Sequence, residues 1–468
     1  GYVIGAMPGF DITTGVALLL PLSYMMGQVE ALAFFSAMYC AGVFGGSITA
    51  ILFGIPGTSE SVTSAIEGYK FTRRGEAGRA LGIAVACSGG AGIAASFVLL
   101  LAAPAVASVS LKFGPGEYAA LGLLGCAAVV SSGGGRDFLK GFYALLLGLF
   151  LATVGPDPMT GEYRFVVTPV LQDGVGLIPA LIGLFAVSDI LWRLLVRDLP
   201  EISNVGQGSR LMLPSIKAYA GLSGAFSRSW LIGLFTGVLP GAGASSAAFI
   251  AHSTEVRVTG GEMSDQSPRP SRLAAPETAK NAAAVGALIP LLALGIPGSS
   301  AAAVILGAFE IHSLQAGPLL FSQHPQLANM ILMSVLLANI VFMASSVFLM
   351  RPVSMLARIP FHLLAVGVLV LSVTGSVATG GVSGAAVMVG MAMLGILLRL
   401  LSWPLAPVIL GVVLGPIIEV YLRRGLLMAD GDIGALFGSP MCIILLAAAL
   451  AMLFAQGIVG MCRQQFGR

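Results

Sequence analysis

The sequence predicts an all-α polytopic membrane protein with two structurally repeated halves, each containing a re-entrant, broken helix hairpin. Three observations favour this fold class. The 468 residues are 57% hydrophobic and only 10% charged, with a mean hydropathy of +0.94, whereas a soluble domain carries about 25% charged residues. Apolar runs of bilayer-spanning length recur along the chain. Finally, one short Pro-Gly motif occurs twice, at residues 54–59 and 295–300.

Each copy of this motif reads Gly-Ile-Pro-Gly-(Thr/Ser)-Ser and lies between an apolar run and a stretch of small residues. Proline cannot donate a backbone hydrogen bond and glycine tolerates unusual backbone angles, so a helix should break there. Broken backbone at membrane depth is tolerated only where it is buried in protein or lines a cavity. A single copy would fit a turn at the membrane surface. A pair in corresponding positions instead indicates the binding site of a transporter.

The first half is predicted to span residues 1–195. Its first transmembrane helix leads into the turn Pro8-Gly9, and we expect that helix to be truncated at the N-terminus. The apolar runs that follow are 13–26, 29–56, 81–109, 117–133, 138–155 and 175–195. Residues 196–228 then form a polar linker, whose excess of lysine and arginine favours a cytoplasmic loop over an ordinary linker of either orientation.

The second half, residues 229–430, repeats the first. Pro240-Gly241 matches Pro8-Gly9, and Ala316-Gly317 matches Ala77-Gly78. Residues 431–468 supply a C-terminal transmembrane helix and a tail. The later apolar runs are 327–350, 361–380, 382–401, 404–421 and 441–461. We expect about 11–12 transmembrane helices plus the two hairpins. Whether the halves are inverted or parallel stays open, with inverted favoured.

Glycines and small hydroxyl side chains surround the two motifs. Backbone N–H groups freed at the start of a half-helix suit a carboxylate, and freed carbonyls with hydroxyls suit Na⁺. Asp11 and Glu60 stand where the second half has Gly243 and Ala301. Each either binds a cation, carries a coupled proton, or caps a helix near the surface. The candidate substrate- and ion-binding residues are Gly9, Asp11, Gly46, Ser47, Gly57, Thr58, Ser59, Gly241, Gly243, Ser245, Asn281, Gly298, Ser299 and Ser300.

Other charged residues at apparent membrane depth are Asp189, Glu277, Glu310 and Glu419. Lys280 either pairs with Glu277 or attracts an anionic substrate, and the ion pair is the favoured interpretation.

The sequence argues against an enzyme and against nucleic-acid binding. It contains neither a GxxxxGK[ST] motif nor HExxH. Residues 381–384 match the GxSG of intramembrane serine proteases, but no histidine follows His362 to act as the base. The four histidines lack metal-ligand spacing, so no cofactor is expected. A channel is the stronger rival, although channels usually build their filters from rings of identical groups.

These motifs resemble the large membrane subunit, the permease, of the tripartite tricarboxylate transporter family. The similar stretches lie in the order of the family and cover most of the chain. They are residues 7–9, 39–58, 67–69, 75–82, 239–244, 275–277, 281–283, 294–299 and 314–320.

The resemblance implies a multi-pass permease of the bacterial inner membrane. It implies uptake of a di- or tricarboxylate driven by Na⁺ or H⁺, by elevator-like movement of the hairpin-bearing part. The implied partners are a small membrane subunit of about four helices and a periplasmic solute-binding protein; a homo-oligomer is a further expectation. The alternative is a carboxylate channel or exporter on the same scaffold.

The family motif positions map onto this sequence with two departures. Asp11 stands where a glycine is usual, and Ser59-Glu60 replaces a small, uncharged pair. Na⁺ is expected near Thr58, Ser299 and Asn281. The mapped positions are Gly9, Gly45, Gly46, Ser47, Gly57, Thr58, Gly241, Gly243, Asn281, Gly298 and Ser299.

Overall fold

The computed structural model describes residues 1–7, 11–132, 138–196, 212–239, 241, 243–260, 267–356 and 361–466. This part of the chain is almost wholly helical, with one antiparallel pair of short strands, β1 (Gly155–Pro156) and β2 (Tyr163–Arg164). Six of its helices are long and apolar enough to cross a membrane: Gln28–Phe53, Ala77–Ser110, Leu177–Val196, Pro325–Ser346, Ala365–Leu400 and Leu405–Met428. The prediction of an all-α polytopic membrane protein is therefore confirmed.

The first half contains the N-terminal helices, the first broken hairpin and four further apolar segments. Its elements are α1 (Tyr2–Ala6), α2 (Ile12–Leu19), the 3-10 turn η1 (Leu20–Met25), α3 (Gln28–Phe53), the 3-10 turn η2 (Ser59–Ser61), α4 (Val62–Thr72), α5 (Ala77–Ser110), α6 (Pro115–Ser132), α7 (Phe138–Ala152), the strands, η4 (Pro169–Leu171), and a single span made of α8 (Leu177–Leu181), the π-helical η5 (Ile182–Val187) and α9 (Ser188–Val196).

The rest of the chain supplies the second broken hairpin and the later apolar helices. Its elements are α10 (Ile216–Gly221), α11 (Ser223–Val238), α12 (Gly243–Val258), α13 (Pro270–Gly286), α14 (Leu288–Leu294), α15 (Ser300–Ile311), α16 (Pro318–Gln323), α17 (Pro325–Leu356), α18 (Phe361–Leu400), α19 (Leu405–Met428), α20 (Ile433–Phe437) and α21 (Pro440–Phe466). The runs predicted at 361–380 and 382–401 form two helices that share the label α18, because the backbone between them is not helical at Gly380 (φ −138°, ψ 16°) and Gly381 (φ +60°, ψ −150°). Glycine permits the positive φ at which the first of these helices ends and the chain turns into the second.

Both Pro-Gly motifs break their helices in the same way. Gly54 ends α3 with φ +71° and Gly295 ends α14 with φ +74°, the left-handed cap that glycine favours. The chain then turns through the motif and continues into α4 in the first half and α15 in the second. We call the turn at 54–61 the first tip and the turn at 295–300 the second tip.

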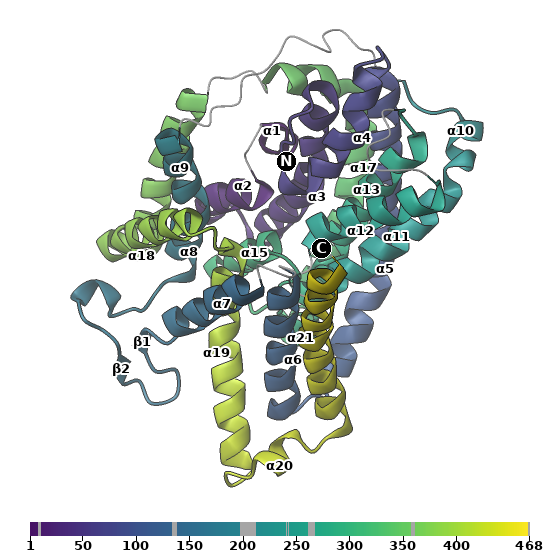
Figure 1. Ribbon diagram of the computed structural model, residues 1–468. Coiled ribbons are helices and arrows are strands. Elements are labelled where there is room, and N and C mark those ends of the chain that lie inside the picture. Colours follow the sequence, from purple (N-terminus) through teal and green to yellow (C-terminus); the bar gives the residue numbers. More distant parts are fainter. Residues whose placement is uncertain are drawn as a thin grey trace.

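Helices in this fold approach closely through small residues. In the second half, α11 lies on α13, and a Cβ built on Gly237 would lie 2.3 Å from the carbonyl oxygen of Ala283. In the first half, α1 lies on α3 through Gly5 and Gly42 in the same way. Such contacts are typical of helix packing in membranes. Figure 1 shows each pair side by side.

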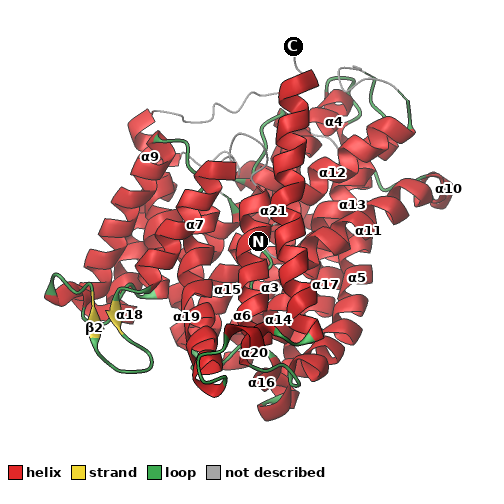
Figure 2. Cartoon of the chain, turned by 60° about the horizontal axis from the view of Figure 1, so that its bottom comes forward, coloured by secondary structure: helices red, strands yellow, loops and turns green. Residues whose placement is uncertain are grey.

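The helices run between two faces of the molecule. In both views α4 and α9 lie towards the top and α20 lies at the bottom, and in Figure 2 most helices run roughly between these faces. The basic residues Lys70, Arg73, Arg74 and Arg79 occur where α4 ends and α5 begins, so positive charge gathers at the α4 face.

Candidate functional site

A cavity of about 560 Å³ lies between the first and second tips. Its remaining walls come from α2, the starts of α12 and α19, helix α9, the last turn of α18, and single residues of α3, α6, α7 and η5. The structure brings nine of the candidate residues to it: Asp11, Gly57, Thr58, Ser59, Gly241, Gly243, Ser245, Ser299 and Ser300. This volume falls within the range of about 300–1,000 Å³ typical of small-molecule sites.

A network of hydroxyl groups joins the two halves across this cavity. Asp11 caps α2, and its Oδ1 accepts a hydrogen bond from the backbone N–H of Thr13 at 2.9 Å. Its Oδ2 accepts from Ser59 Oγ at 2.8 Å, and Ser59 Oγ in turn accepts from Ser245 Oγ at 3.2 Å. Thr13 Oγ1 lies 3.1 Å from Ser300 Oγ. Asp11 is therefore both a helix cap and a member of the cavity wall.

Two carboxylates, those of Asp11 and Glu60, lie at the first tip and line the cavity. Glu60 lines the cavity with only 9% of its surface exposed, and its Oε2 has no hydrogen-bond partner among the described residues. An unpaired buried carboxylate is costly, so it calls for a proton or a cation. The corresponding second-half positions, Gly243 and Ala301, also line the cavity but carry no charge.

Two arginines that our sequence reasoning missed also line the cavity. Asp189 on α9 accepts from Arg193 Nε through its Oδ2 at 3.0 Å, and its Oδ1 lies 2.9 Å from Arg399 Nη2 on α18. All three side chains line the cavity. The available signal was a basic residue near the end of each of two apolar runs, but such residues usually mark the membrane boundary.

The other candidate residues either do not line the cavity or lie outside the described residues. Gly46 accepts a hydrogen bond from Gly57 N at 3.3 Å, and the carbonyl oxygen of Gly298 accepts one from Gly241 N at 3.0 Å. Both glycines therefore support a turn rather than line the cavity. Gly9 lies outside the described residues.

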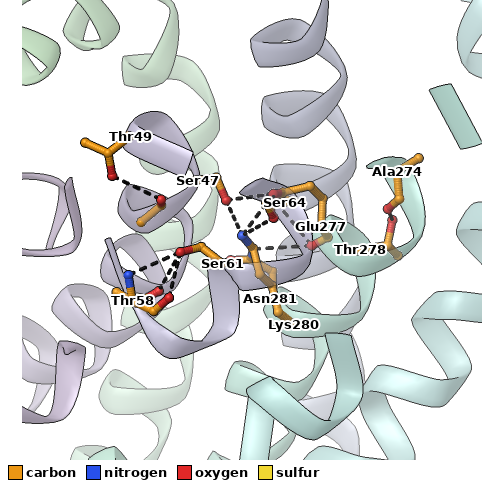
Figure 3. A network of polar contacts seen from close by, with 12 residues as sticks. Ser47, Thr49, Thr58, Ser61, Ser64, Ala274, Glu277, Thr278, Lys280 and Asn281 are labelled. Atoms are coloured by element: carbon orange, nitrogen blue, oxygen red, sulfur yellow. Dashed lines mark hydrogen bonds and ion pairs between the residues drawn. The ribbon is translucent and has the colours of Figure 1, made fainter. Parts of the chain in front are cut away.

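Behind the tips, a buried ion pair binds the two halves together. Glu277 and Lys280 on α13 are fully buried and their charged atoms lie 3.0 Å apart, which confirms the predicted pair. Ser47 of α3 donates to Glu277 Oε1 at 2.6 Å, Ser88 of α5 donates to Oε2 at 2.7 Å, and Ser64 of α4 donates to Oε1. We call this group the Glu277 hub. Figure 3 shows Ser47, Ser64 and Lys280 gathered around the carboxylate.

Asn281 is buried next to the hub. Its Nδ2 donates weakly to the Glu277 carbonyl at 3.4 Å, and its Oδ1 has no partner among the described residues. Thr58 and Ser299 line the cavity whereas Asn281 does not, so the Na⁺ position expected near these three residues stays a prediction. Within the described ranges, no group of three or more His, Cys, Asp or Glu side chains is arranged to hold a metal ion.

A second cavity of about 840 Å³ lies towards the other face of the molecule. Its walls include the end of α5, the end of α7, the later part of α19 and residues Leu294 and Gly295 of the second hairpin. Helix α15 runs between the two cavities, with Ser300 and Ala301 in the first and Leu306 and Glu310 in the second.

Comparison with known proteins gives a family and two relatives. The family model described as "Tripartite tricarboxylate transporter TctA family" matches residues 1–410. An uncharacterized 52.8 kDa protein in the TAR-I ttuC' 3' region of Agrobacterium vitis is 34% identical over 457 residues, covering 96% of this chain and 90% of the relative. An uncharacterized protein in the TAR-II ttuC' 3' region of the same organism is 31% identical over 220 residues, covering 47% of this chain and 90% of that relative. No solved structure matches.

Proposed function

The chain belongs to the tripartite tricarboxylate transporter TctA family, and from this premise we propose that it is the permease for secondary-active, cation-coupled uptake of a di- or tricarboxylate across a bacterial inner membrane. The observation that carries this proposal is the cavity between the two tips, where hydroxyl groups of both halves meet. In transporters, helices broken near the bilayer midplane characteristically form the substrate and ion sites.

The second tip offers the binding groups for the substrate. Helix α15 begins at Ser300 and runs for 12 residues, so its first backbone N–H groups carry partial positive charge beside the cavity. A carboxylate is the natural ligand for such a helix end.

The first tip and the adjoining N-cap of α2 offer the binding groups for the coupling cation. Glu60 with its unpartnered Oε2, Asp11 and the hydroxyl of Ser59 present oxygen atoms to the cavity. Protonation of Glu60 would couple uptake to H⁺, and ligation between the oxygen atoms would couple it to Na⁺.

Two cavities at opposite ends of α15 fit a carrier better than an open channel. We assign the α4 and α9 face to the cytoplasm because basic residues gather there. The cavity between the tips then lies towards the cytoplasmic side, and movement of the hairpin-bearing part would expose the site to the other side. A small membrane subunit and a periplasmic binding protein would complete the transporter, as the tripartite family implies.

The proposal is tested by reconstituting the chain with its small membrane subunit in proteoliposomes. Uptake of radiolabelled citrate and succinate is measured with and without the binding protein, and with ionophores that dissipate the Na⁺ or H⁺ gradient. We expect uptake to require the binding protein and one of the two gradients. Flux that persists without either would establish the channel instead, and gradient-driven efflux would establish the exporter.

A further inference from the structure

We propose that Arg399 binds a second carboxylate of the substrate, so that the cavity selects di- and tricarboxylates over monocarboxylates. This inference rests on the function proposed above and adds a residue that determines specificity. It starts from the arginines that line the same cavity as the two tips.

Arg399 is held in place from one side only. It lies in the last turn of α18, and its Nη2 forms an ion pair at 2.9 Å with Oδ1 of Asp189, which is nearly buried. The other oxygen of that carboxylate is occupied by Arg193 at 3.0 Å. Asp189 therefore fixes the direction of Arg399 while sharing its single negative charge with a second guanidinium.

The guanidinium of Arg399 retains hydrogen-bonding capacity for a ligand. It has five N–H donors in a planar fork that matches a carboxylate. Among the described residues Asp189 is its one ion-pair partner, and its Nε is buried with no hydrogen-bond partner. Its side chain is 25% exposed and lines the cavity, so the cation is partly removed from water. A cation in that setting favours an anionic ligand.

The position of Arg399 separates this subsite from the tips. The two tips and the neighbouring helix α2 supply hydroxyls and helix N–H groups, whereas Arg399 comes from α18. A monocarboxylate can bind either the groups at the tips or Arg399. A ligand with two or three carboxylates can bind both at once within one cavity of about 560 Å³. The charge-assisted, bidentate geometry available to arginine would make this second contact strong.

The test uses the chain with its small membrane subunit in nanodiscs, titrated calorimetrically with citrate, succinate and propionate at constant ionic strength and cation concentration. The variants are Arg399→Gln, which removes the charge, and Arg399→Lys, which keeps the charge but loses the fork. The matched control is Arg424→Gln, because Arg424 is an exposed arginine of α19 that does not line the cavity.

We expect wild type to bind citrate and succinate more tightly than propionate. Arg399→Gln should weaken citrate and succinate binding by about 10- to 100-fold while changing propionate binding by less than about 2-fold, because one charged hydrogen-bonded contact is lost. Arg399→Lys should fall between wild type and Arg399→Gln, and Arg424→Gln should equal wild type. Size-exclusion profiles and thermal transitions verify that each variant is folded.

Wild-type citrate affinity in a folded Arg399→Gln variant would overturn the inference, as would an equal loss of propionate and citrate binding. Failure of the proposed function has a different signature, since wild type itself would then bind none of the three acids.

Discussion

The two tips share a backbone design but differ in charge. Gly57 packs against the carbonyl of Gly5 and the backbone of Gly46, and Gly298 packs against the carbonyl of Gly237 and the backbone of Ala287. These contacts correspond position by position between the halves, whereas Glu60 at the first tip and the adjoining Asp11 have uncharged counterparts, Ala301 and Gly243, in the second half.

The tips also differ in how the chain leaves them. The second tip enters a regular helix at once, with Ser299 as its cap, while the first passes through the short η2 turn that carries Glu60. The comparison teaches that close backbone packing is the common requirement of both tips. Charge, and with it the proposed binding of the coupling cation, belongs to the first tip alone.

The largest expected effect comes from adding one methyl group at a tip glycine. A Cβ at Gly57 would lie 2.1 Å from the Gly5 carbonyl oxygen, whereas at Gly298 the nearest atom is the Gly237 carbonyl oxygen at 2.8 Å. We expect Gly57→Ala to reduce citrate uptake by about 100-fold or more, since small displacements of binding groups have effects of this size. Gly298→Ala should reduce it less, and valine at either position should abolish it.

The control for these variants is Gly390→Ala in α18, where an added Cβ meets nothing within 4 Å. All variants should insert into the membrane at wild-type levels. Wild-type uptake by Gly57→Ala would show that the first tip is not part of the transport site.

A second effect concerns the hub that joins the halves. Lys280→Met leaves the fully buried Glu277 without its cation, and breaking such a pair typically costs about 3–5 kcal/mol. We expect a loss of this size in the free energy of unfolding, measured by reversible denaturation in detergent. The double variant Glu277→Gln/Lys280→Met should be less destabilised than Lys280→Met. A double variant as unstable as the single one would argue against an uncompensated charge as the cause.

A third test removes the charge difference between the tips. Glu60→Ala introduces the residue found at the corresponding second-half position, Ala301. We expect the apparent affinity of uptake for the coupling cation to fall by about 10- to 100-fold, because one charged contact is lost. The measurement is citrate uptake as a function of Na⁺ concentration and of pH. Asp11→Gly, which copies Gly243, should act in the same direction. Unchanged cation dependence in both variants would move the cation site elsewhere.

The smallest effect concerns helix capping at the tips. Ser299 Oγ accepts from Ala302 N at 3.1 Å and contacts Tyr39 OH, while the contact of Thr58 Oγ1 with Ser61 Oγ is longer, at 3.4 Å. Ser299→Ala should therefore cost about 1 kcal/mol of stability, and Thr58→Ala should cost less. Denaturation curves of the two variants give the loss in free energy of unfolding for each. A larger loss for Thr58→Ala than for Ser299→Ala would contradict the assignment of Ser299 as the cap.

Composition and local chemistry made much of this fold predictable. The run predicted at 81–109 lies within α5, and the break after residue 53 follows from glycine and proline chemistry that acts within a few residues. The Glu277–Lys280 pair was predictable because residues three apart share one face of a helix.

Contacts between distant segments were not predictable in the same way. Arg193 and Arg399 meet at Asp189 from positions about 200 residues apart, and each alone looks like a marker of the membrane boundary. Ser47 stands in a motif with the candidate residues, yet it turns towards Glu277 because the packing of α3 on α13 decides its direction.

The Glu277 hub has a consequence for how the two tips can be displaced. Its serines come from α3, α4 and α5, and its carboxylate and ammonium come from α13. Moving one tip away from the other would separate these serines from Glu277 and leave its charge buried without those hydrogen bonds. The hub therefore opposes a mechanism in which the two tips open independently. It favours instead a mechanism in which both tips move together as parts of one rigid body.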